Sequence, residues 1–109
     1  MAVRVVLIDA DGRPQSLADP SGGTFNAAGD FDSLIGLIGV GAELPMWSSL
    51  YTEEDWTFVR DDLVALLRDL DALDGRAQSE AERRGLLRLR LLAETALIDP
   101  ELTLEWQAD

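Results

Sequence analysis

The chain has 109 residues, of which 21 are acidic and nine are basic, and its formal net charge is −12. All the basic residues are Arg, because the sequence contains no Lys, and it also lacks His and Cys. These absences exclude disulfide bonds, zinc–thiolate sites, Schiff-base chemistry and catalytic triads that depend on His. Length and composition together predict one globular domain that spans residues 1–109.

No segment of the sequence resembles a targeting signal or a membrane span. The longest uncharged apolar stretch runs from Leu34 to Ala42 and has nine residues, three of them Gly. A helix that crosses a bilayer needs about 20 apolar residues. We therefore expect a cytoplasmic protein that does not associate with a membrane.

The N-terminal residues predict a strand followed by a turn. Residues 3–8 are apolar and mostly β-branched, which is typical of a strand, and Asp9-Ala10-Asp11-Gly12 is typical of a turn. Residues 13–18 could return as the second arm of a hairpin, which Pro14 would confine to a sheet edge. Residues 19–29 contain Pro20 and three Gly and predict a loop.

Two weaker elements follow. Asp30 can cap a short helix over residues 31–38, whose predicted apolar face comprises Phe31, Leu34, Ile35 and Ile38. Residues 43–50 contain Pro45 and predict an irregular segment with Trp47 tucked beneath it.

A long helix is predicted from about residue 53 to residue 73. The tetrad Thr52-Glu53-Glu54-Asp55 resembles a capping box, and Tyr51 and Trp56 have the spacing of a hydrophobic staple. Asp74-Gly75 would end the helix. Its apolar stripe comprises Trp56, Val59, Leu63, Leu66, Leu70 and Leu73.

A second capping box, Ser79 to Glu82, predicts another helix that ends near Ile98, before Pro100. Its Leu and Ala residues cover more than one face, so we expect this helix to be buried between a sheet and the preceding helix. Residues 101–106 alternate polar and apolar and predict a half-buried strand. The fold class is therefore α+β: a small antiparallel sheet, made of an N-terminal strand or hairpin and a C-terminal strand, with three helices packed on one face.

The segment from Val6 to Gly12 resembles the first motif of haloacid-dehalogenase-like phosphatases, which implies a nucleophilic Asp9 and an acid/base Asp11. The chain departs from that pattern, because Arg13 stands where the family has Thr or Val and no Lys follows. A calcium-binding EF-hand loop also fails, because Pro occupies the positions that require Gly and Glu. We interpret these residues as a hairpin turn, and expect no catalytic residues, no metal ion and no cofactor.

The charge is concentrated in one segment. Residues 53–74 carry a net charge of −6, and Asp55, Asp62 and Asp69 recur every seven residues, which predicts one side of the helix. This stripe is either a solvated face or a contact face for a basic partner, with Phe58 and Trp47 as apolar anchors.

Positive charge is concentrated further along the chain. Four Arg between residues 83 and 90 give that stretch a charge of +4. We expect them to pair internally with Glu80, Asp61 or Asp62, and we expect no direct nucleic-acid binding, since the rest of the chain repels phosphate.

In size, charge and lack of catalytic side chains, the whole chain resembles small acidic immunity or antitoxin proteins of bacteria. The resemblance implies a basic protein partner, a toxin whose active site is occluded. We predict a non-catalytic binding module that contacts its partner through Asp55, Phe58, Asp62, Asp69 and Trp47. Two alternatives stay open: a structural or assembly subunit that forms a homodimer or larger oligomer through the helix at residues 80–98, and a nucleic-acid mimic whose carboxylates imitate phosphates.

Overall fold

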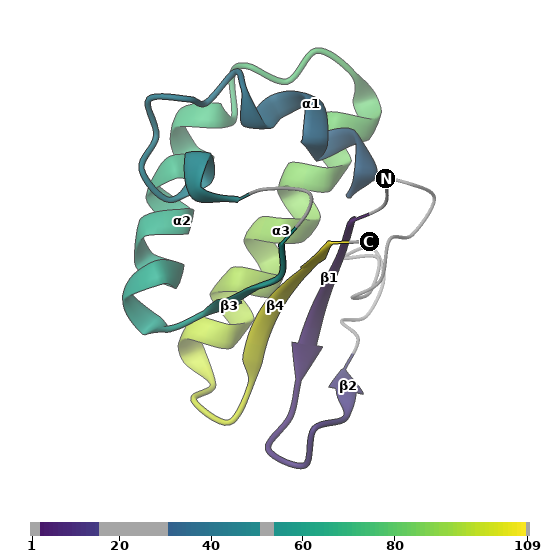
Figure 1. Cartoon of the computed structure of the whole chain (residues 1–109), viewed down its shortest axis with the longest axis vertical. Coiled ribbons are helices and arrows are strands. Elements are labelled where there is room, and N and C mark those ends of the chain that lie inside the picture. Colours follow the sequence, from purple (N-terminus) through teal and green to yellow (C-terminus); the bar gives the residue numbers. More distant parts are fainter. Residues whose placement is uncertain (1–2, 16–30, 51–53, 109) are drawn as a thin grey trace.

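The computed structural model describes residues 3–15, 31–50 and 54–108, and its fold is α+β. Four strands form an antiparallel sheet in the order β2-β1-β4-β3: β1 (Val3–Ile8), β2 (Pro14–Gln15), β3 (Trp56–Phe58) and β4 (Thr103–Ala108). The helices are α1 (Ile35–Ile38), α2 (Arg60–Leu73) and α3 (Glu80–Ile98). Helix α3 lies across one face of the sheet and α2 packs beside it (Figure 1), so the predicted fold class is confirmed.

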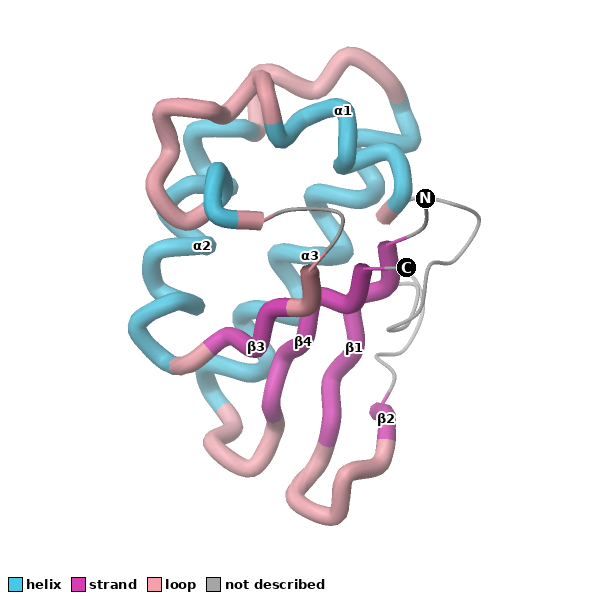
Figure 2. Tube along the Cα trace, viewed as in Figure 1, coloured by secondary structure: helices cyan, strands magenta, loops and turns pink. Residues whose placement is uncertain are grey.

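The first and last strands of the chain lie side by side in the middle of the sheet (Figure 2). Val5 pairs with Trp106 and Leu7 with Leu104, and all four side chains are buried on the face that the helices cover. The predicted strands at both ends of the chain are thus confirmed, and β4 extends beyond the predicted end to Ala108. In β4 the buried Leu104 and Trp106 alternate with half-buried residues, and this alternation fixes the register, because a shift by one residue would turn the apolar side chains away from the core.

The predicted turn after β1 is also confirmed. Gly12 has a φ of 80°, which a residue with a side chain rarely adopts, and the Asp9 N–H donates to the Arg13 carbonyl. Pro14 and Gln15 form β2 at the sheet edge, as the Pro predicts. The rest of the predicted hairpin arm, the loop at residues 19–29, the Asp30 cap and residues 51–53 lie outside the described residues.

The N-terminal boundary of the long acidic helix was predicted wrongly. Residues 56–58 form β3, which pairs with β4, and α2 begins only at Arg60. Two aromatic residues and a Thr favour a strand, and β4 offers these residues an edge with which to pair. Val59 is 62% exposed instead of being part of the core stripe, and its N–H donates to the Asp62 carboxylate, 3.2 Å away.

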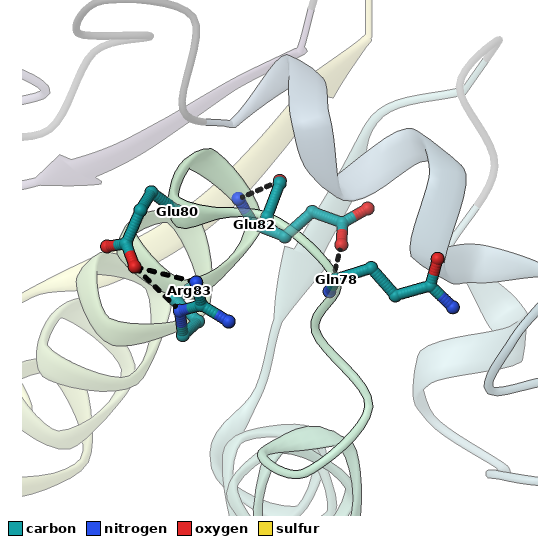
Figure 3. Close-up of polar contacts among 5 residues, drawn as sticks. Gln78, Glu80, Glu82 and Arg83 are labelled. Atoms are coloured by element: carbon teal, nitrogen blue, oxygen red, sulfur yellow. Dashed lines mark hydrogen bonds and ion pairs between the residues drawn. The ribbon is translucent and has the colours of Figure 1, made fainter.

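Helix α3 starts where its capping box predicts. The Ser79 hydroxyl accepts a hydrogen bond from the Glu82 N–H (3.1 Å). The Glu82 carboxylate accepts one from the Gln78 N–H (2.7 Å; Figure 3). One side of α3 packs against α2 and another against β1 and β4, which confirms the predicted burial on two sides. Across the described ranges, no helix has the length and apolarity that a membrane crossing requires.

The first turn of α3 also provides a pH-dependent contribution to stability. Glu80 forms an ion pair with Arg83 (2.6 Å; Figure 3), and the hydrogen bond from Arg83 holds the pKa of Glu80 below its ordinary value of 4.5. A carboxyl group whose pKa is lowered by folding stabilises the folded state above its unfolded pKa, and this contribution is lost as the pH falls through the folded value.

We therefore expect the Glu80→Gln variant to have a lower Tm than the parent at pH 7, and the same Tm at a pH below the lowered pKa of Glu80. Thermal unfolding followed by circular dichroism at both pH values measures the difference. Arg83→Gln serves as the matched variant, because it removes the same ion pair and should show the same convergence. A Tm difference that persists at low pH would mean that Glu80 stabilises α3 through something other than its charge.

Candidate functional site

The structure separates the five residues predicted to contact a partner. Asp55 is exposed just before β3, and Asp62 is half-buried in the first turn of α2. Phe58, Asp69 and Trp47 are buried. The expectation that Asp55, Asp62 and Asp69 line one side of a helix is wrong, because residues 55–58 are not helical and the seven-residue spacing no longer aligns them.

Asp69 holds the loop before β3 onto α2. Its Oδ2 atom accepts hydrogen bonds from the backbone N–H groups of Met46 (2.8 Å) and Trp47 (2.9 Å). These two donors belong to the turn that opens the 3-10 segment Trp47–Ser49, so the carboxylate caps that turn from a neighbouring helix. Asp69 is therefore a structural residue and not part of an exposed contact face.

Trp47 is a central residue of the core. Its Nε1–H donates to the Leu37 carbonyl (2.7 Å), and its ring packs edge-to-face on Trp106 with the ring centroids 6.2 Å apart. Gly41 lies so close that a Cβ at this position would come within 2.4 Å of the indole Cδ1. The predicted tucked position of Trp47 is confirmed, and its predicted role as an exposed anchor is wrong.

Asp9 uses both carboxylate oxygens within its own turn. Oδ1 accepts from the N–H groups of Asp11 and Arg13, each at 2.9 Å, and Oδ2 accepts from the Gln15 amide at 2.8 Å. These bonds account for Asp9 as a hairpin residue. In the part of the chain that the structure describes, no three acidic side chains converge in a way that could hold a metal ion.

Two of the four arginines of α3 are seen in ion pairs within the chain, one of them with a predicted partner. Arg83 pairs with Glu80, as expected, whereas Arg90 pairs with Asp71 of α2 (2.7 Å) and not with Asp61 or Asp62. The helix that precedes α3 runs antiparallel to it, and this packing brings Asp71 beside Arg90. Outside α3, Arg76 forms an ion pair with Glu43, and its hydrogen bond lowers the pKa of the Glu43 carboxyl.

An open groove of about 350 Å³ lies where the sheet splays apart at the end of β3. The last pair between β3 and β4 is Phe58 with Leu104; Val59 then turns into α2, while Thr103 continues along β1. Ala96 and Leu97, near the C-terminal end of α3, close one side of the space between these diverging segments. We call it the β3–α2 groove, and its walls include Thr57, Phe58, Val59, Arg60, Leu97 and Leu102.

Acidic residues flank the groove-lining residues in the sequence. Lining residues 57–60, 100, 102 and 103 lie within two segments, residues 54–62 and 99–105, which each carry a net charge of −3 and together hold half of the chain's −12. Glu54, Asp55, Asp61 and Glu101 are exposed. Arg60 is the one basic residue of these two segments, and its guanidinium donates to the Leu97 carbonyl (3.3 Å) at the end of α3.

The groove also adjoins an open edge of the sheet. β3 is the outermost strand, and within the described ranges no strand pairs with its outer side. Val59 is exposed at one border of the groove, next to this edge. Sequence reasoning missed this surface because it assigned residues 56–59 to a helix; the polar Thr57 between the aromatic residues Trp56 and Phe58 was the signal of a strand that the sequence offered.

The comparisons with known proteins do not assign the chain to a family. No protein-family model, no curated protein and no solved structure gave a significant match.

Proposed function

We propose that the protein is a non-catalytic binding module that docks on a basic segment of a partner protein through the β3–α2 groove. One observation carries the proposal: an apolar groove of about 350 Å³ lies between two chain segments that together hold half of the net negative charge. Apolar walls accept an aliphatic side chain, while carboxylates around them attract neighbouring Lys or Arg residues.

The charge has a kinetic as well as an equilibrium effect. A net charge of −12 accelerates the encounter with a basic partner and disfavours acidic competitors. Because Glu54, Asp55, Asp61 and Glu101 are exposed, salt screens them, and binding should weaken as the ionic strength rises. The edge strand β3 offers main-chain hydrogen bonds to an extended segment, which is a common mode of peptide recognition.

Arg60 is the feature of the groove that opposes such a partner. Its guanidinium already donates a hydrogen bond to the Leu97 carbonyl, which lies at the negative C-terminal end of the α3 dipole. The positive charge of Arg60 also repels another cation. A partner's Arg or Lys would compete with Arg60 for this position. Arg60 therefore lowers the affinity for a basic segment in this proposal.

We expect Arg60→Gln to strengthen the binding of a basic peptide about twofold to fivefold, and Asp61→Asn and Glu101→Gln to weaken it by similar factors, since each removes one exposed charge. The probe is a synthetic peptide of alternating Arg and Val residues, and isothermal titration calorimetry at low and high salt measures its affinity. A peptide of alternating Glu and Val should not bind.

Asp74→Asn is the matched control for these variants, because it removes an exposed carboxylate at the opposite end of α2 from the groove. It should change the affinity less than Asp61→Asn does. If all three carboxylate variants had equal effects, the peptide would be responding to the net charge and not to the groove, and the proposal would fail.

The same chemistry supports a narrower proposal, that the partner is a basic toxin and this chain its cytoplasmic immunity or antitoxin protein. The support is the small size, the acidity and the docking groove, together with the sequence resemblance described above. Affinity capture from the native cell with the parent and with the Asp61→Asn/Glu101→Gln double variant tests it. A basic toxin retained by the parent and lost with the double variant is the expected result; recovery of no basic protein would contradict it.

A further inference from the structure

We propose that the anchor residue of the partner is an Arg, whose guanidinium replaces that of Arg60 at the C-terminal end of α3; this inference rests on the proposed function of the β3–α2 groove. Arg60 lines the groove, and its Nη1 atom donates to the Leu97 carbonyl, 3.3 Å away. The chain itself therefore contains an example of the chemical group that this end of the groove accepts. A partner side chain that carries the same group can take the same place.

The position of Arg60 is favourable for α3 and not for its own helix. Arg60 is the first residue of α2, where the helix dipole is positive and disfavours a cation, whereas the Asp61 and Asp62 that follow have the favoured charge. The last turn of α3, in contrast, has no basic residue of its own. Arg60 thus brings to the negative end of α3 the cation that this end favours, from a different helix.

The end of α3 has carbonyl groups that need hydrogen-bond donors, because the last four carbonyls of an α-helix have no partner within the helix. The Thr95 carbonyl accepts from the Asp99 N–H (3.0 Å), and the half-buried Leu97 accepts from Arg60. A group that displaces Arg60 must therefore donate to the Leu97 carbonyl in its place, since a buried acceptor that loses its donor is costly.

A guanidinium meets these requirements better than an ammonium group does. It has five N–H donors in a planar fork, so it can donate to the Leu97 carbonyl and to a carboxylate at the same time. Glu101, between the lining residues Pro100 and Leu102, is exposed and available for such a pair. A guanidinium is also less strongly hydrated than an ammonium, so it loses less on entering a groove with apolar walls such as Phe58.

Two peptides of equal charge test this inference. One alternates Lys and Val, and the other is identical except that its central Lys is Arg. Isothermal titration calorimetry measures the affinity of each peptide for the parent and for Arg60→Gln. We expect Arg60→Gln to bind the Arg peptide at least about fivefold more tightly than the Lys peptide. The parent should show a smaller preference, because Arg60 competes with the guanidinium of the peptide.

Arg68→Gln is the matched control, because it removes an exposed Arg further along the same helix. It should prefer the Arg peptide to the same extent as the parent does. Carbon NMR of the Leu97 carbonyl follows the contact directly: its resonance should shift in Arg60→Gln and return toward the parent position when the Arg peptide binds. Circular dichroism verifies that both variants are folded.

The possible outcomes separate this inference from the proposal on which it rests. If neither peptide bound to the parent or to Arg60→Gln, the proposed function would fail. If both peptides bound equally well, the docking of basic segments would stand and the Arg anchor would be overturned. An Arg preference that Arg60→Gln does not enlarge, or a Leu97 carbonyl resonance that the Arg peptide does not move, would also overturn the anchor.

Discussion

Replacing Trp47 with Ala is expected to lower the free energy of unfolding by about 3–5 kcal/mol, the range for large-to-small substitutions of a buried aromatic residue. The substitution removes a fully buried indole, its edge-to-face contact with Trp106 and its hydrogen bond to the Leu37 carbonyl. Urea denaturation monitored by far-ultraviolet circular dichroism measures the change. For a domain of ordinary stability, this loss is a large fraction of the total.

The close approach of Gly41 to Trp47 provides a control for this prediction. Gly41→Ala alone should destabilise the parent by about 1–3 kcal/mol, because the new Cβ overlaps the indole ring. In the Trp47→Ala background the ring is gone, so the second substitution should cost much less. Strictly additive changes in a double-mutant cycle would mean that the two residues do not constrain each other as the structure indicates.

Replacing Asp69 with Ala is expected to lower the free energy of unfolding by about 2–5 kcal/mol, since two buried N–H groups lose their acceptor. These groups belong to Met46 and Trp47, and the described contacts of Asp69 link α2 to the loop that carries Trp47. Asp69→Asn should be milder, because the amide oxygen can still accept from both donors. Chemical denaturation of both variants measures the difference.

Asp74→Asn is the matched control for Asp69, since it changes the same residue type at an exposed position after the same helix. Its effect should fall within about 0.5 kcal/mol of zero, as for most surface substitutions. Equal losses for Asp69→Ala and Asp74→Asn would contradict the capping role of Asp69. A loss for Asp69→Asn as large as for Asp69→Ala would show that the charge, and not the acceptor oxygen, is what the two N–H groups require.

Local patterns in the sequence predicted those elements whose stability depends on neighbouring residues. The turn at Asp9–Gly12, the Ser79 cap of α3 and the edge position of Pro14 all follow from local chemistry, and the structure confirms each. The alternation of residues 101–106 likewise predicted β4. In the turn and the cap a side chain bonds to the backbone within a few residues of itself, whereas β4 was predicted from its alternation alone and is held by its pairing with β1.

The boundary at residues 56–59 shows where local reasoning fails. Trp56 and Val59 have the spacing of a helical stripe, but Trp56 pairs with Trp106, 50 positions away in the sequence. The free edge of β4 decides between strand and helix, and no window of neighbouring residues contains that information. The candidate site was missed for the same reason, because the β3–α2 groove exists only where β3 leaves the sheet.

The sequence by itself therefore determined the fold class, the two strands that pair the chain's ends, the start of α3 and the uneven distribution of charge. Only the tertiary structure decided which acidic residues are exposed: Asp69 is buried because two backbone donors from a distant loop need an acceptor, whereas Asp61 remains in solvent. It also decided that Trp47 fills the core and that Leu87 and Ile98 do not. Periodicity assigns a residue to a side of its helix, but the neighbours that pack against that side decide whether the residue is buried.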